Sequence, residues 1–173
     1  AGTYELKVDV TDNVTGKMES GMVEVVVVDE VGTTVEFGGS ADRLAHVTFD
    51  SDTSDEEGNL SLTLQGGASI AGGSGQFAGA VRLDGGSEEV AIADHPDLNF
   101  GNGPWTERTI SLWFSADAVS SRQMIYEEGG STTGLNIYLV NDTLYVGGWN
   151  TGNGWSGTWR SISGVTAGTW HNV

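Results

Sequence analysis

The sequence predicts an all-β protein made of many short antiparallel strands, as in a sandwich, a jelly roll or a barrel. Glycine, which is typical of tight turns, supplies 27 of the 173 residues, whereas proline occurs twice. That glycine content is more than double the usual share of roughly 7%. Apolar residues make up 38% of the chain and recur with a period of two. No stretch from residue 44 onward has the periodicity of a helix.

The first thirty residues predict a β-hairpin. The run "TYELKVDVT" alternates between apolar and polar residues, and "MVEVVVV" follows after a segment rich in turn-forming residues. A lone hairpin is marginal in water, so residues 1–30 are interpreted as the last strands of a domain. Residues 31–43 are small and polar and predict a linker, with a short strand at Thr33–Phe37.

Alternating runs predict a series of strands from residue 44 to the end. They are "LAHVTFD", the segment around Leu60, Leu62 and Leu64, "AVRLDG", "EEVAIAD", "RTISLWFSAD", "WRSISGV" and "GTWHNV". In "RTISLWFSAD", the pattern places Ile110, Leu112 and Phe114 on one face and Trp113 on the other.

A further hairpin is predicted where "GLNIYLV" and "TLYVGGW" flank Asn141 and Asp142. Asparagine and aspartate tolerate the positive φ that a mirror-image two-residue turn requires, so this pair favours a tight connection between two strands.

The order of these motifs is that of a known domain type. An opening strand ending in "FD", an acidic loop leading to Gly-Asn, the pair "GAVRLDG" and "EEVAIAD", the strand "TISLW" and a closing "WHNV" follow one another across residues 45–173. This order resembles the laminin G-like, concanavalin A-like jelly-roll domains. The opening "AGTYELKVDVTDNVTG" and "MVEVVVVDE" resemble the last strands of a PKD or cadherin-like immunoglobulin repeat.

The resemblance implies a domain organisation. Residues 1–30 would close an immunoglobulin-like repeat, residues 31–43 would form a linker, and residues 44–173 would form a laminin G-like jelly roll truncated at its C-terminus. Members of that family continue past "W.HV" with further strands. The chain is therefore expected to be a segment of a longer multidomain protein, with neighbouring domains of the same chain as partners and open sheet edges that favour self-association.

The charge balance excludes two classes of partner. Seven Lys and Arg oppose 24 Asp and Glu, which gives a formal net charge of −17. Nucleic acids and anionic membranes would be repelled by such a surface, because their binding needs clustered positive charge. No run of about 18 apolar residues is present, so membrane insertion is not expected. Cysteine is absent, which excludes disulfides and thiolate metal sites.

An acidic loop gives a candidate metal site. Asp50, Asp52 and Asp55 lie within six positions, followed directly by Glu56 and Glu57. Calcium prefers several oxygen ligands from such loops, although the spacing is not that of an EF-hand. The resemblance adds weight to calcium, since related jelly rolls hold a structural calcium near their loops. The alternative is a solvated turn in an acidic protein.

A tryptophan-rich segment gives a candidate ligand site. "GGWNTGNGWSGTW" sets tryptophans among glycine and small polar residues, and its candidate ligand-binding residues are Trp149, Asn150, Asn153, Trp155 and Trp159. Indole faces stack on the C–H faces of sugar rings, while amides and hydroxyls bind sugar hydroxyls. The alternative is core or hairpin packing, which also accounts for Trp113 and Trp170 in their strands.

The expected activity is binding and not catalysis. The chain has no "GxSxG" nucleophile motif, and no predicted strand carries the acid-x-acid-x-x-acid pattern of the glucanases with this fold. We therefore expect an extracellular, secreted or cell-surface adhesion module that binds a carbohydrate or glycoprotein with the help of calcium. The alternatives are a structural module of a surface layer or filament, and an accessory domain of a secreted glycan-active enzyme.

Overall fold

The protein is all-β, with antiparallel sheets throughout the described residues. A computed structural model describes residues 43–98 and 108–173 in full and the backbone of residues 4–11 and 18–25. Its strands are β1 Tyr4–Thr11, β2 Met18–Val25, β3 Leu62–Gln65, β4 Ser69–Ala71, β5 Ala80–Arg82, β6 Glu89–Ile92, β7 Trp113–Ser115, β8 Gln123–Gly129, β9 Thr133–Val140, β10 Thr143–Asn150, β11 Trp155–Ser163 and β12 Trp170–Asn172. One 3₁₀ turn, η3, spans Thr151–Asn153.

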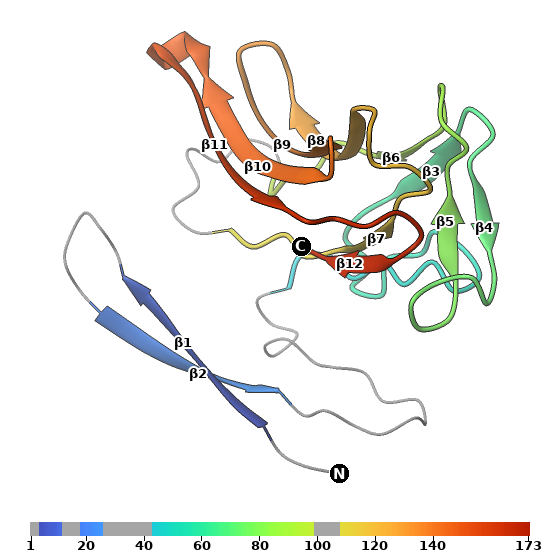
Figure 1. Ribbon diagram of the computed structural model, residues 1–173, viewed down its shortest axis with the longest axis horizontal. Coiled ribbons are helices and arrows are strands. Elements are labelled where there is room, and N and C mark those ends of the chain that lie inside the picture. Colours follow the sequence, from blue (N-terminus) through green and yellow to red (C-terminus); the bar gives the residue numbers. More distant parts are fainter. Residues whose placement is uncertain (1–3, 12–17, 26–42, 99–107) are drawn as a thin grey trace.

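The largest sheet has four strands in the order β11-β10-β9-β8. The remaining strands pair two by two: β1 with β2, β3 with β6, β4 with β5 and β7 with β12. Figure 1 shows the four-stranded sheet in orange to red, with β7 and β12 along one side of it and the two green pairs beyond. Among the described residues, no helix has the length and apolar character that a membrane crossing requires.

The hairpin formed by β9 and β10 confirms the predicted two-residue turn. Asn141 has φ 49° and Asp142 has φ 58°, the left-handed values that a mirror-image turn needs. The turn fixes the register, so that Val140 pairs with Thr143 and Tyr138 with Tyr145. This register decides on which face of the sheet each residue of β9 and β10 lies.

The core lies between the four-stranded sheet and the segment around β7. Ile137 and Leu139 of β9 are 1% and 0% exposed. They form one cluster with Leu144, Phe114, Ala116 and Val165. The predicted alternation of "RTISLWFSAD" is confirmed, because Phe114 is buried and Ile110 and Leu112 pack against the same cluster. A bulge in β8 between Met124 and Tyr126 lets both Ile125 and Tyr126 pack on the core.

Two strand predictions differ from the structure. Residues 44–50, "LAHVTFD", form no strand and contribute only an isolated bridge between Val47 and Asp55. β2 begins at Met18, four residues before the predicted run, because its first residues complete the ladder to Thr11. The short strand predicted at Thr33–Phe37 lies outside the described residues. The sequence did not predict β4 and β8, because neither segment alternates regularly between apolar and polar residues.

Trp113 corrects the prediction that core packing accounts for it. Its side chain is 43% exposed and meets Phe77 edge to face, with ring centroids 5.6 Å apart. The alternation that buries Phe114 turns its neighbour Trp113 outward.

Candidate functional site

One side of the four-stranded sheet, facing away from the core, carries a row of aromatic side chains. Tyr138 pairs with Tyr145 across β9 and β10, and Trp159 of β11 pairs with Gly147 of β10. Paired residues share a face, and alternate residues along one strand lie on the same side. This side is therefore opposite to Leu139 and Leu144. We call the aromatic residues on this side of the sheet the aromatic face; they are Tyr138, Tyr145, Trp149 and Trp159.

The two tryptophans of the aromatic face lie against glycines. A Cβ atom at Gly134 would sit 2.5 Å from Cζ2 of Trp149, and one at Gly147 would sit 2.7 Å from Cγ of Trp159. Real Cβ atoms do not approach other atoms this closely, so the indoles can rest on the sheet only where side chains are missing. Glycine at both positions lets each ring lie close to the backbone.

Hydrogen bonds hold both indoles in place. Nε1 of Trp149 donates to the carbonyl of Gly130 at 2.9 Å. Nε1 of Trp159 donates to Oδ1 of Asn136 at 3.0 Å, and Asn136 is itself buried. A ring fixed by packing and a hydrogen bond loses little conformational entropy when a ligand covers it. Trp159 nevertheless stays 38% exposed.

The two tyrosines stand beside the tryptophans as a stacked pair. Their ring centroids are 4.9 Å apart and their planes differ by 7°. The guanidinium of Arg122 lies 4.3 Å from the centroid of the Tyr138 ring, which is a cation–π contact. On the neighbouring strand β11, the residue paired with Tyr145 is the small Ser161.

The structure divides the five ligand-binding residues that the sequence predicts. Trp149 and Trp159 lie on the aromatic face. Trp155 pairs with Asn150, and its indole donates to Oγ1 of Thr158 at 3.3 Å. A bulge in the β10–β11 ladder precedes this pair, and the alternation places Trp155 on the opposite side of the sheet from Trp159. Trp155 is 47% exposed there.

Asn150 and Asn153 form a local turn at the tip of the β10–β11 hairpin. Oδ1 of Asn150 accepts the backbone N–H of Asn153 at 3.2 Å and caps η3. Gly154 follows with φ 76°, the left-handed conformation that ends such a turn. The amide of Asn150 therefore organises the loop beside Trp149.

Sequence reasoning missed Tyr138, Tyr145, Asn136 and Arg122. A signal for three of them was present in the predicted hairpin. A two-residue turn at Asn141 and Asp142 fixes the pairing, and counting back from it puts Tyr138 beside Tyr145 and Asn136 beside Gly147. Arg122 precedes β8, which was not predicted, so no register could place it.

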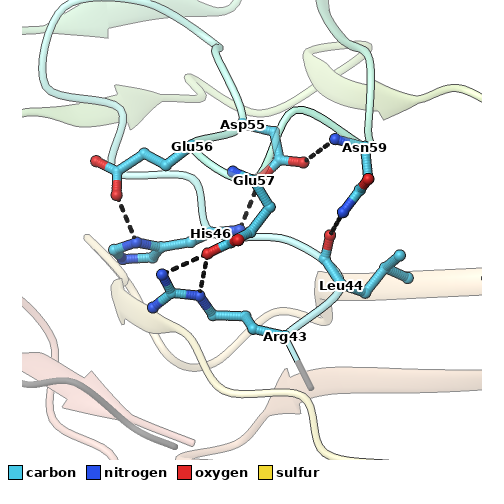
Figure 2. Close-up of polar contacts among 7 residues, drawn as sticks. All are labelled: Arg43, Leu44, His46, Asp55, Glu56, Glu57 and Asn59. Atoms are coloured by element: carbon cyan, nitrogen blue, oxygen red, sulfur yellow. Dashed lines mark hydrogen bonds and ion pairs between the residues drawn. The ribbon is translucent and has the colours of Figure 1, made fainter. Parts of the chain in front are cut away.

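The acidic loop is organised around the carboxylate of Asp55, shown in Figure 2. Its Oδ1 accepts the backbone N–H of His46 at 2.7 Å and of Glu57 at 3.2 Å. Its Oδ2 accepts those of Asn59 at 3.0 Å and Leu60 at 2.9 Å. Burial opposes ionisation of Asp55, but these four donors together outweigh it and hold the pKa of the carboxyl below its ordinary value.

Side-chain contacts around Asp55 join the same two segments. Arg43 forms an ion pair with Glu57, and Nδ1 of His46 lies 2.8 Å from Oε2 of Glu56. Nδ2 of Asn59 donates to the carbonyl of Leu44 at 2.9 Å. Figure 2 shows that these contacts surround the carboxylate of Asp55 and fasten residues 43–46 to residues 55–59.

The other two predicted metal ligands contact different backbone groups. Oδ1 of Asp50 accepts the N–H of Gly79 at 3.0 Å, and Oδ1 of Asp52 accepts that of Ser54 at 2.8 Å. The bond from Ser54 lowers the pKa of Asp52. Within residues 43–98 and 108–173, no three His, Asp or Glu side chains are grouped so as to hold a metal. The calcium site at Asp50, Asp52 and Asp55 stays a prediction.

Comparisons with known proteins add no relative. No family model, no curated protein and no solved structure matches the chain.

Proposed function

We propose that the aromatic face binds carbohydrate, as part of an extracellular adhesion or carbohydrate-binding module of a larger surface protein. The observation that carries the proposal is the pair of indoles, Trp149 and Trp159, each packed closely against a glycine and held by a hydrogen bond from its Nε1. Flat aromatic rings offer sugars a complementary surface for their apolar C–H faces. The ordering of both rings before binding makes that surface rigid.

The negative charge of the chain is more compatible with a neutral carbohydrate than with a polyanionic ligand. A net charge of −17 repels nucleic acid and other polyanions, whereas it does not repel an uncharged sugar. Calcium assistance is kept as part of the proposal, because the acidic loop at Asp50 and Asp52 offers exposed carboxylates.

Replacing Trp159 with alanine should weaken glycan binding by about 2 kcal/mol, roughly thirtyfold in Kd, because the variant loses an exposed, preorganised ring. The measurement is a glycan array followed by titration calorimetry on the best ligand. Trp155→Ala is the matched control, since that indole is similarly exposed but lies on the other side of the sheet. Equal losses in both variants, or none in either, would contradict the proposal.

The same array separates the calcium component from the aromatic one. It is run once with millimolar calcium and once with a chelator. Binding that disappears with the chelator supports calcium assistance. Binding that is unchanged leaves the aromatic face as the whole site and removes calcium from the proposal.

A second candidate function is assembly with another copy of the chain through β11. This strand lies at the end of the sheet order, and no described strand pairs with its outer edge. Ile162 on β11 is 67% exposed, although it pairs with the buried Leu144. Unpaired edges with exposed apolar residues are templates for strand pairing.

If the chain assembles through β11, sedimentation velocity should show a dimer whose fraction rises with protein concentration. The variant Ile162→Lys should remain monomeric at the same concentrations, because an edge lysine opposes pairing. A wild-type chain that stays monomeric throughout would rule out assembly through β11.

A further inference from the structure

We infer that the ligand of the aromatic face is an extended, neutral polysaccharide chain of flat, equatorially linked sugars, bound along its length and not at its end. This inference rests on the proposed function and specifies its substrate class. It follows from the layout of the rings, from the hydrogen bonds that they already make and from the charges around them.

The residues that carry the rings occupy successive levels along the strands. The Tyr138–Tyr145 pair forms one level, Trp159 with Gly147 the next, and Trp149 with Gly134 the third. Levels two residues apart are separated by about 7 Å, so the aromatic face extends over about 14 Å. A surface of that length contacts more than one pyranose ring, which favours a chain over a single sugar.

Two cavities of the described residues lie on the core side of the sheet, opposite the aromatic face. One is lined by Ile137, Leu135 and Val146, and the other by Phe114, Leu144 and Ile162. A row of rings that spans several residue pairs of the ladder suits the interior of a chain.

The N–H groups of the two indoles are already engaged. Both indole N–H groups donate within the protein, and Oδ1 of Asn136 accepts one of them. The indoles can therefore offer a ligand their ring faces but not their N–H groups. Pyranoses with equatorial hydroxyls and linkages present flat C–H faces to such rings, whereas α-linked chains curve away from them. The aromatic face should select chain shape ahead of hydroxyl pattern.

Charges on this side of the sheet oppose an acidic polysaccharide. Glu127 of β8 pairs with Asn136 and is exposed beside the aromatic face. Arg122 presents its guanidinium plane to Tyr138 at one end. Against a net charge of −17, one arginine engaged with a ring does not attract a polyanion.

The test is a calorimetric series on the whole chain. The probes are β-1,4-linked glucose oligomers from one to six units, maltohexaose as the α-linked hexamer, and a β-1,4-linked glucuronate hexamer as the acidic chain of the same linkage. We expect affinity to rise at least tenfold from the dimer to the β-linked glucose hexamer. Maltohexaose and the glucuronate hexamer should bind at least tenfold more weakly than the β-linked glucose hexamer, and the deficit of the glucuronate hexamer should shrink in high salt, which screens the repulsion.

The variants locate the effect on the aromatic face. Tyr145→Ala should reduce the rise in affinity with oligomer length, because it removes one end of the aromatic face. Trp155→Ala should leave that rise unchanged. Near-ultraviolet circular dichroism checks that each variant is folded. If Tyr145→Ala is unfolded, the conservative Tyr145→Leu, which keeps the volume but not the flat ring, replaces it and must also reduce the rise in affinity with oligomer length.

The outcomes separate this inference from the proposed function. Equal affinity for glucose and the β-linked glucose hexamer overturns the inference but leaves carbohydrate binding in place. So does tighter binding of the glucuronate hexamer that is lost in Arg122→Gln. Absence of binding to every oligomer and to every glycan of the array overturns both.

Discussion

Replacing Asp55 with alanine is expected to lower the free energy of unfolding by about 3 kcal/mol or more. The carboxylate accepts four backbone N–H groups, from His46, Glu57, Asn59 and Leu60. Hydrogen bonds to a charged group contribute about 1.5–3 kcal/mol each, and each buried donor left without an acceptor costs about 1–3 kcal/mol. Water reaching the exposed end of the loop offsets part of that sum.

The measurement is urea unfolding followed by tryptophan fluorescence. Asp52→Ala is the matched control, because that exposed carboxylate in the same loop accepts one backbone N–H, from Ser54. A much smaller change is expected there. Similar effects of the two substitutions would show that the four bonds to Asp55 do not determine the stability of the loop.

The pH dependence gives the same prediction a second readout. A carboxyl whose pKa is lowered in the folded state stabilises the fold above its unfolded value of about 3.9 and loses that contribution as the pH falls through the folded value. Asp55→Asn cannot ionise. The difference in stability between wild type and Asp55→Asn should therefore be largest above about pH 5 and shrink below about pH 4. A difference that is constant with pH would contradict the role of the charge.

Local pattern was enough to predict the strands whose partners are close in the sequence. The alternation around Phe114 reflects burial of one face, and Asn141 and Asp142 have the backbone preferences of their turn. Both signals are properties of a few adjacent residues. The all-β class and the β9–β10 hairpin follow from signals of this kind.

Features that depend on distant contacts were not predictable in the same way. "LAHVTFD" alternates like a strand, yet His46 donates its backbone N–H to the side chain of Asp55. Phe49 then takes φ 58°, which no alternation pattern reveals. The side of Trp155 depends on a bulge, because one extra residue in β11 changes the face of everything beyond it.

The candidate site shows both situations. Trp149 and Trp159 were recognised by type and composition, whereas Tyr138 and Tyr145 required the register of the hairpin. The glycines beneath the indoles were counted in the sequence only as turn formers. Their role at Gly134 and Gly147 became visible when the rings were placed on them.

Gly147→Ala is the second substitution with a large expected effect, about 2–3 kcal/mol of stability. The new Cβ would collide with the carbonyl oxygen of Thr158 and would sit 2.7 Å from Cγ and Cδ1 of Trp159. Overpacking a well-packed site costs about 1–3 kcal/mol, and the backbone oxygen in the ladder cannot move far. Gly130→Ala is the control, because nothing lies within 4 Å of its Cβ position, and a change within about 0.5 kcal/mol is expected.

A double-mutant cycle resolves the two collisions of Gly147→Ala. Removing the indole in Gly147→Ala/Trp159→Ala eliminates the clash with the ring but keeps the clash with Thr158. The alanine at position 147 should therefore cost less stability in the Trp159→Ala background than in the wild type, since contacting residues are not additive. A full cost in both backgrounds would mean that Trp159 does not rest on Gly147. In that case the ring is held by its hydrogen bond to Asn136 without packing on Gly147, and the close packing on which the carbohydrate proposal depends is absent there.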